Sequence, residues 1–426
     1  MSSEDVPTIN RYHHRWSSLP DDIIFEIISR VGLPRKVVIT VSASNFTIEQ
    51  TVAPNYNIYE LWTTLDNLFT VFIPPFIDTF SFNLHTDHYD EPRCWPIIDA
   101  WARRLSACNI QHFRAYKAFR YRPHEHVYPL SIFRMHSLIS LDLSLCSRIA
   151  SWAPYSIILP NLKKLRLRYV NYECLRQLLS CCPSLEDLSS SINESMKHLV
   201  SLTSKKLKRL CIILKGFSIV DVVIDTPILE ELIIYWYPIV SVRTFDSISK
   251  VRSLELHGSW ARLECNPRNT ITYPNLTDLK LVTCSPELFK AIGLMLDCPK
   301  LEVFVIYMDT TDSIKKMVWD QEAVFGPVEH VKHINLYMNT IVDIFSENIV
   351  NIVTLLLRSA KVLEKLTLFG YGPLKNQRYL AIPQFHQTLA ECVEATSRCQ
   401  LELLGAYKWP TEVAHFSEGQ SYLTLN

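Results

Sequence analysis

The chain has 426 residues, 48% of them hydrophobic, and its 43 Lys and Arg residues balance 43 Asp and Glu residues. Because the net charge is zero, no global field draws the chain onto nucleic acid or an anionic membrane, and we expect neither as a partner. No run approaches the roughly 20 uninterrupted apolar residues that cross a bilayer, and the polar start Met1–Asn10 lacks the apolar core of a signal peptide. We therefore expect a cytoplasmic or nuclear protein, whose 12 cysteines are free thiols that pack as small hydrophobes.

An amphipathic helix is predicted within Trp16–Pro34, after a leader over residues 1–14 that we expect to be flexible. Asp21 suits the positive end of the helix dipole, and Gly32 followed by Pro34 ends the helix. The apolar face of this helix consists of Ile23, Ile24, Ile27, Ile28 and Val31. A helix of about three turns needs a partner for such a face. That partner can be another protein, or the end of a repeat array that the helix caps.

The next stretch, Arg35–Pro54, has a different character. It is rich in Val, Thr, Ile and Ser, and its apolar residues do not recur with a helical period. Such a composition favours β structure over helix.

From residue 138 onward, the pattern Leu-x-x-Leu-x-Leu or an apolar equivalent returns every 22 to 32 residues. The copies begin at Leu138, Leu162, Leu185, Leu207, Leu229, Val251, Leu276, Leu301, Val331 and Leu363. A fixed period in the twenties is typical of a leucine-rich-repeat solenoid, in which each repeat adds one short strand and a helical or irregular return. The sequence therefore predicts an α/β fold, a leucine-rich-repeat solenoid (horseshoe) over residues 63–345. Such solenoids usually bind a partner rather than catalyse a reaction.

Side chains of each short strand alternate between the core and the opposite, concave face. When Leu165 and Leu167 point into the core, the residues between and beside them lie on the concave face. The candidate target-binding residues predicted by this rule are Lys164, Arg166, Arg168, Tyr235, Glu255, His257, Tyr307, Tyr337 and Phe369. Aromatic residues are enriched in interface cores, which favours a protein target. A covering loop or C-terminal segment would also explain the late apolar positions, and a solvated charged face the early ones.

The returns and the C-terminal segment carry helical and strand patterns. In Tyr172–Cys182 the apolar residues share one helix face, and Ile341–Ala360 is an apolar stretch with helical periodicity. Leu363–Gly372 (LEKLTLFGYG) and Ala395–Gly405 (ATSRCQLELLG) then have the pattern of two strands. Because a terminal repeat cannot leave its core face bare, we expect residues 346–426 to hold the last repeats and a cap.

Both ends of the chain resemble a known family. Leu19-Pro20-Asp21, the isoleucines after it and Leu33-Pro34 resemble the first half of an F-box, and the two C-terminal strands resemble the FBD region of plant F-box/leucine-rich-repeat proteins. Members of that family continue the F-box with more helix, a basic, Ser-rich stretch and a Trp. Arg35–Pro54 does not match this continuation, and the likeness resumes at Glu60–Leu65. We therefore assign residues 15–62 to a partial F-box-like segment with a divergent second half.

The resemblance implies partners and a role. An F-box docks on the Skp-type adaptor of a cullin-RING ubiquitin ligase, which implies adaptor contacts by Leu19, Pro20, Ile24, Ile27, Ile28, Leu33 and Pro34. It implies a substrate-recognition subunit of an Skp-cullin-F-box E3 ubiquitin ligase, whose repeats bind an unknown target protein for ubiquitination. The alternative is a non-catalytic leucine-rich-repeat scaffold that has lost adaptor binding, because half of the F-box is divergent.

The sequence offers no motif for catalysis, a cofactor or a metal. It has no H-E-x-x-H, G-x-S-x-G or G-x-x-x-x-G-K-[ST] pattern, and its nine glycines argue against a Gly-rich phosphate loop. His85-x-x-His88 with Cys94 lacks the four ligands of a structural zinc site. We therefore expect no enzyme, no cofactor and no metal site, so any ubiquitin transfer is carried out by partner proteins.

Overall fold

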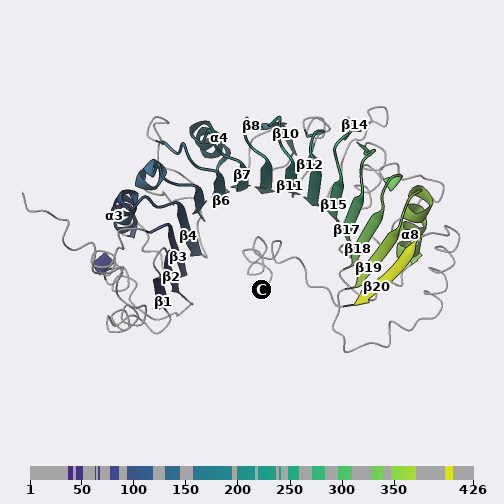
Figure 1. Cartoon of the computed structure of the whole chain (residues 1–426), viewed down its shortest axis with the longest axis horizontal. Coiled ribbons are helices and arrows are strands. Elements are labelled where there is room, and N and C mark those ends of the chain that lie inside the picture. The colour runs from purple at the N-terminus through teal and green to yellow at the C-terminus, as the bar shows by residue number, and fades with distance from the viewer. Residues whose placement is uncertain are drawn as a thin grey trace, which may run out of the picture. The chain divides into compact units, whose positions relative to one another are not determined.

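The computed structural model describes residues 37–41, 45–50, 63, 66–67, 77–85, 94–118, 130–143, 157–193, 199–215, 219–236, 239–240, 248–258, 271–283, 296–308, 328–338, 347–370 and 399–405. The chain divides into two compact units. The N-terminal unit comprises residues 1–194 and 202–215, and the C-terminal unit comprises residues 195–201 and 216–426. Within each unit, strands lie side by side in a ladder (Figure 1).

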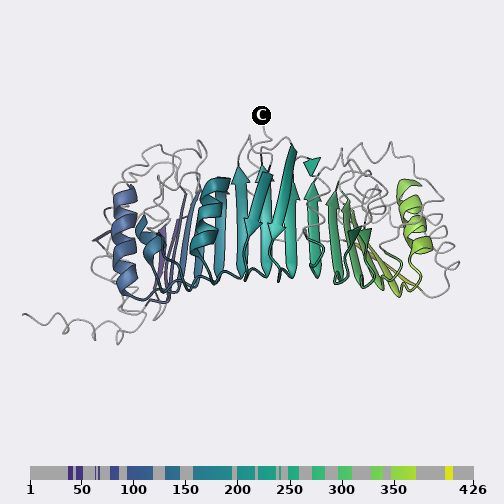
Figure 2. The ribbon, with the colours of Figure 1, turned by 90° about the horizontal axis from the view of Figure 1, so that it is seen from above.

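The sheet of the N-terminal unit begins with an antiparallel hairpin and continues as a parallel ladder. Its strands, in spatial order, are β1 (Val37–Val41), β2 (Asn45–Gln50), β3 (Thr79–His85), β4 (His112–Ala118), β5 (Ser140–Leu143), β6 (Lys164–Val170), β7 (Asp187–Asn193) and β9 (Arg209–Lys215). Parallel neighbours need a crossover between them. Part of that crossover chain is helical, in α3 (Cys94–Ala107), η4 (Leu130–Arg134) and α4 (Tyr172–Cys181), which lie on one side of the sheet (Figures 1 and 2).

Aromatic residues fill the first part of the N-terminal core. Phe80 and Phe82 of β3, Phe113 of β4 and Trp101 of α3 are at most 2% exposed, and their ring centroids are 5.6 to 6.4 Å apart. The indole Nε1 of Trp101 donates a hydrogen bond of 2.9 Å to Oδ1 of Asp66, so the one polar atom of that ring is satisfied. This cluster replaces the leucines of later repeats and attaches α3 to the sheet.

The C-terminal unit repeats the parallel arrangement. Its main strands, in order, are β11 (Glu231–Trp236), β13 (Ser253–Gly258), β15 (Asp278–Thr283), β17 (Val303–Met308), β18 (His333–Met338), β19 (Lys365–Gly370) and β20 (Gln400–Gly405). Shorter parallel pairs join β10 (Ile219–Asp225) to β12 (Ile239–Val240) and β14 (Ile271–Thr272) to β16 (Leu296–Asp297). Helix α8 (Glu347–Ser359) lies on one side of this ladder (Figure 2), and β8 (Leu199–Thr203) precedes β9 in the sequence.

The predicted leucine ladder is confirmed. All ten predicted first positions are at most 6% exposed, and the apolar residues at the fourth and sixth positions are buried as well. Full burial of one such side chain stabilises the fold by roughly 1.5–3 kcal/mol, and each repeat contributes up to three of them. The chain therefore forms a leucine-rich-repeat solenoid, as the sequence predicts.

Within each unit, backbone hydrogen bonds connect neighbouring repeats in a constant geometry. The carbonyl of Ile139 accepts from the N–H groups of both Lys163 and Lys164, at 2.9 and 3.0 Å. In the C-terminal unit the carbonyl of Glu302 accepts in the same way from Lys332 and His333, both at 3.0 Å. Because this bifurcated bond lies just before the strand, it fixes the register of neighbouring strands and places equivalent side chains opposite each other.

The helical returns agree with the sequence prediction. Helix α4 spans Tyr172–Cys181, and the side chain of its N-cap residue Asn171 accepts a hydrogen bond from the Cys174 N–H at 2.7 Å. Of the face predicted to be apolar, Leu175 and Leu178 are fully buried. Leu179 is only partly buried, because the helix ends within its next turn.

Buried cysteines behave as apolar core residues. Cys182 and Cys298 are 3% exposed, and burial raises the pKa of each thiol to about 12. A thiol with such a pKa stays protonated at neutral pH and is neither a good nucleophile nor a ready metal ligand. Cys174, Cys182 and Cys298, the buried free cysteines among the described residues, thus fit the predicted role as hydrophobic filling.

The two ends of the chain are described to different extents. Trp16–Pro34, with every predicted adaptor-binding residue, lies outside the described residues. The β character predicted for Arg35–Pro54 is confirmed, since β1 and β2 form there and β2 joins the parallel ladder at β3. Two strands therefore lie within residues 15–62, and the proposed domain boundaries stay predictions. No helix among the described residues is both long and apolar enough to cross a membrane.

Candidate functional site

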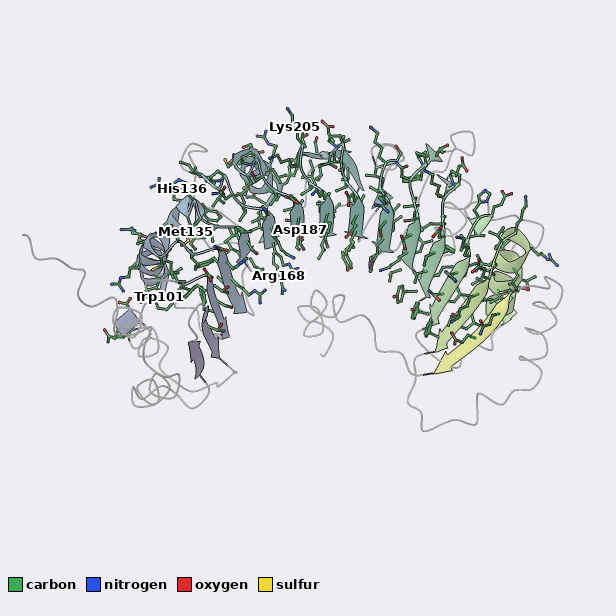
Figure 3. The ribbon with its side chains drawn as sticks, in the orientation of Figure 1. Trp101, Met135, His136, Arg168, Asp187 and Lys205 are labelled. Atoms are coloured by element: carbon green, nitrogen blue, oxygen red, sulfur yellow. The ribbon has the colours of Figure 1, made fainter. Side chains whose placement is uncertain are left out.

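In the N-terminal unit, charged side chains of β4 to β9 gather on the sheet face away from α3 and α4. We call this surface the cationic face and define it by Arg114, Asp142, Lys164, Arg166, Arg168, Asp187 and Arg209. Strand register brings together residues from five strands: Arg114 lies opposite Asp142, and Asp142 opposite Arg166, while Lys164 lies opposite Asp187, which lies opposite Arg209. In Figure 3, Arg168 lies on the side of the sheet away from α4.

Each carboxylate of the cationic face lies between two cations. Oδ2 of Asp142 is 3.6 Å from Arg114 Nε and 3.8 Å from Arg166 Nη1. Oδ2 of Asp187 is 3.2 Å from Lys164 Nζ and 3.4 Å from Arg209 Nη2. Each carboxylate thus reduces the repulsion between the two cations on either side of it.

Burial on the cationic face differs between the two signs of charge. The side chains of Asp142 and Asp187 are 8% and 18% exposed, whereas those of Arg114, Lys164 and Arg209 are 47 to 55% exposed. A partner that approaches this face therefore meets positive groups first. The predicted residues Lys164, Arg166 and Arg168 do lie together here, on β6.

In the C-terminal unit, the face away from the buried leucines carries a row of rings that is interrupted once. We call it the aromatic row and define it by Tyr235, His257, Tyr307, Tyr337 and Phe369, with Val282 between the second and third members. Register pairs each member with the next along β11, β13, β15, β17, β18 and β19. Five residues predicted from scattered repeats are thus brought into one line.

The rings of the aromatic row stack face to face in two groups. Tyr235 and His257 have ring centroids 4.0 Å apart, Tyr307 and Tyr337 are 4.4 Å apart, and Tyr337 and Phe369 are 4.2 Å apart, the last pair only 3° from parallel. Such spacing follows from the strand separation of about 4.8 Å, because residues in register must lie one strand apart. Each stacked pair contributes roughly 0.5–1.5 kcal/mol beyond its buried area.

Two members of the aromatic row are buried, at 6% exposure for His257 and 7% for Tyr307. They order the row but offer little area to a target, and a direct target contact by either stays a prediction. Tyr235, Tyr337 and Phe369 are partly exposed and can contribute contact area. Val305, in the adjacent row, is also buried, at 6%.

A polar cluster accompanies the aromatic row on β13. Nε2 of His257 lies 2.6 Å from Oε1 of Glu255, and Nζ of Lys280 on β15 donates to Oε2 of Glu255 at 3.3 Å. Burial raises the pKa of Glu255, but the hydrogen bond and charge of His257 and the nearby Lys280 outweigh it, so the pKa lies below its usual value. The carboxylate therefore stays ionised and holds the His257 ring in its stack on Tyr235.

Sequence reasoning missed two residues of these surfaces. Arg114 lies on β4, where Phe113 and Ala115 replace the leucines, so the repeat pattern did not reveal this strand. Lys280 lies between Leu279 and Leu281 of a recognised repeat, and the alternation rule was sufficient to find it.

At the C-terminal end, the two strands that carry the FBD resemblance are neighbours. β19 and β20 pair in parallel from Lys365 opposite Gln400 to Gly370 opposite Gly405. Lys365 Nζ lies 2.8 Å from Oε2 of Glu402 on the next strand. The late segment thus adds one more strand to the ladder.

A ladder of buried leucines with varied residues on its opposite face defines a leucine-rich-repeat protein. Residues 98–260 match the family model described as the LRR repeats of the FBD-associated F-box protein At5g56370. The sequence and the structure thus agree on the class of protein.

Individual relatives make the likeness more specific. The chain is 23% identical to the F-box/FBD/LRR-repeat protein At3g26920 of Arabidopsis thaliana, over 91% of this chain and 95% of the relative. It is 27% identical to the FBD-associated F-box protein At5g60610, over 70% and 83%. With the FBD-associated F-box protein At4g10400 it shares 29% over 50% of this chain, and spans 53% of that relative. The resemblance to F-box/FBD/LRR-repeat proteins is confirmed, at low identity over much of the chain.

Proposed function

We propose that the protein is the substrate-recognition subunit of an Skp-cullin-F-box E3 ubiquitin ligase. The observation that carries the proposal is the combination of a solenoid with two ordered side-chain surfaces and relatives named F-box/FBD/LRR-repeat proteins. The cationic face and the aromatic row bind the target protein, and the N-terminal segment binds the adaptor. We place this activity in the cytoplasm or nucleus.

In this role the protein contributes no bond chemistry. It holds a target near the ubiquitin-loaded enzyme of the complex, and this raises the effective concentration of the target's lysines. Rigid surfaces suit this task because little side-chain entropy is lost when a target binds. The stacked rings of the aromatic row and the paired carboxylates of the cationic face supply that rigidity.

Adaptor binding is assigned to the apolar residues of the N-terminal helix, Leu19, Pro20, Ile24, Ile27, Ile28, Leu33 and Pro34. The test is co-expression of the full chain with a plant Skp-type adaptor and size-exclusion chromatography. We expect a stable complex that is lost in Ile24→Asp/Ile28→Asp and kept in Glu26→Gln, a change on the side of the predicted helix away from its isoleucines. Absence of a complex with the wild-type chain would overturn the ligase assignment.

A second candidate function is a leucine-rich-repeat interaction scaffold without adaptor binding. It is favoured by β1 and β2, which occupy the stretch where the F-box resemblance implies further helix. The scaffold would bind the same targets through the same surfaces but would leave their lifetimes unchanged. The adaptor experiment therefore separates the two candidates.

A further inference from the structure

We propose that the cationic face binds an extended acidic segment of a partner protein, in which side-chain carboxylates at alternate positions pair with Lys164, Arg166 and Arg168. The inference rests on the proposed function in one respect: it takes this partner to be the target protein of the ligase. It specifies the chemistry of the target, which the repeat fold leaves open.

The charge balance of the face is the first support. Among the described side chains of β4 to β9 on this face, five are Lys or Arg and two are Asp, which leaves an excess of positive charge. Each Asp is shared by two cations, at 3.2 to 3.8 Å. The cations of this face thus outnumber its acids, and most of the cations are also more exposed, which favours an acidic partner.

The excess concentrates on β6. Lys164 has Asp187 opposite it on β7, but Arg166 has Ser189 there, which carries no charge. The Arg166 side chain is 34% exposed, and the Nη groups of a guanidinium can donate to one carboxylate as a bidentate pair.

Strand geometry sets the pattern of the ligand. Residues two apart on a strand are about 6.6–6.8 Å apart, and alternate residues of an extended peptide have the same separation. A segment that runs along β6 with acids at alternate positions can therefore meet Lys164, Arg166 and Arg168 in turn. Adjacent acids on an extended segment point to opposite sides, and only half of them would reach the face.

The same observations disfavour nucleic acid. The chain as a whole has zero net charge, and the excess on the face is confined to a few side chains. Affinity for nucleic acid grows with the number of phosphates neutralised, so a surface this small gives weak binding. Lys164, Arg166 and Arg168, which alternate along β6, instead fit a short peptide.

A direct test is fluorescence anisotropy of the full chain with a labelled Gly-Ser peptide that carries Glu at three alternate positions. Its Gln counterpart is the matched neutral probe, and a single-stranded oligonucleotide with three phosphates is the alternative anion. We expect the Glu peptide to bind, the Gln peptide not to bind, and the oligonucleotide to bind more weakly. Lys164→Gln/Arg166→Gln removes two ion pairs with the peptide, and we expect it to weaken binding of the Glu peptide roughly tenfold.

Lys205→Gln/Lys206→Gln is the matched control, because it removes the same charge from exposed residues of the same unit. Lys205 lies on the opposite side of the sheet from Arg168 (Figure 3). We expect this control to bind the Glu peptide within about twofold of wild type. If Lys164→Gln/Arg166→Gln does not fold, Lys164→Gln alone, at a side chain that is 47% exposed, takes its place with a smaller expected loss.

The inference is overturned if the wild-type chain does not bind the Glu peptide, if the control loses as much affinity as the face variant, or if the oligonucleotide binds more tightly. None of these outcomes bears on adaptor binding, because the titration contains no adaptor. Conversely, failure of the adaptor complex to form leaves the titration unaffected. The two proposals therefore fail separately.

Discussion

The cationic face and the aromatic row have the same backbone arrangement, but their side chains accommodate the close strand spacing in different ways. Parallel strands in register place equivalent side chains about 4.8 Å apart. Rings tolerate that repetition and stack, as Tyr307, Tyr337 and Phe369 do at 4.2 to 4.4 Å. Charges of one sign repel each other at that spacing, and so Lys164 and Arg209 are separated by Asp187.

The two surfaces contribute differently to the stability of the fold. Stacking in the aromatic row excludes water and adds to the stability of the C-terminal unit. Ion pairs on the cationic face are half-exposed, and exposed pairs contribute about 0–1 kcal/mol each. We therefore expect substitutions in the aromatic row to affect folding, and substitutions on the cationic face to affect binding.

The largest effect is expected for Tyr307→Ala. The ring is 7% exposed and stacks on Tyr337, so its removal leaves a cavity and ends the stack. We expect a loss of about 3 kcal/mol in the free energy of unfolding, measured by urea denaturation. The control Tyr307→Phe keeps the ring and should lose less than about 1 kcal/mol. Equal losses in both variants would show that the hydroxyl, not the stack, is responsible.

Next in size is Glu255→Ala, which removes the acceptor beside His257. The imidazole and Lys280 would lose their carboxylate partner in a largely buried site. We expect a loss of about 2 kcal/mol by the same measurement, because a buried polar group left without its partner costs about 1–3 kcal/mol. Glu255→Gln keeps an acceptor and should lose less. A variant as stable as wild type would show that the cluster does not support the row.

A smaller, pH-dependent effect follows from the same carboxylate. The pKa of Glu255 is lower in the folded chain than its unfolded value of about 4.3. Its contribution is therefore present above that value and is lost as the pH falls through the folded pKa. Between about pH 6 and about pH 3, the melting temperature of wild type should fall further than that of Glu255→Gln. Parallel curves for the two proteins would contradict this assignment.

The smallest effect on stability is expected for Lys164→Gln on the cationic face. The side chain is 47% exposed, and Asp187 keeps Arg209 as a partner after the change. We expect the free energy of unfolding to change by less than about 1 kcal/mol. A loss as large as that of Tyr307→Ala would remove the distinction between the two surfaces.

The sequence was sufficient to predict the ladder and the side of each strand on which a residue lies. The spacing of Leu162, Leu165 and Leu167 identifies a strand, and alternation then places Lys164 and Arg166 on the opposite face. It could not predict that Tyr307 is buried, because this depends on register with Tyr337, which lies 30 residues further along the chain.

Contacts within the site were predictable only in part. Glu255 and His257 are two residues apart on one strand and must share a face, but the 2.6 Å contact between them depends on local burial. Arg114 could not be found, because Phe113 and Ala115 hide its strand from a leucine pattern. The N-terminal helix lies outside the described residues and stays a prediction.

The central claim, that this solenoid selects targets for ubiquitination, is tested most directly by target lifetime. Proteins captured by the wild-type chain are followed by pulse-chase in plant cells. The measurement compares cells that express the wild-type chain with cells that express Ile24→Asp/Ile28→Asp, which keeps the repeats intact. We predict longer half-lives for the captured proteins with the variant. Equal half-lives would contradict the ligase role and leave the scaffold.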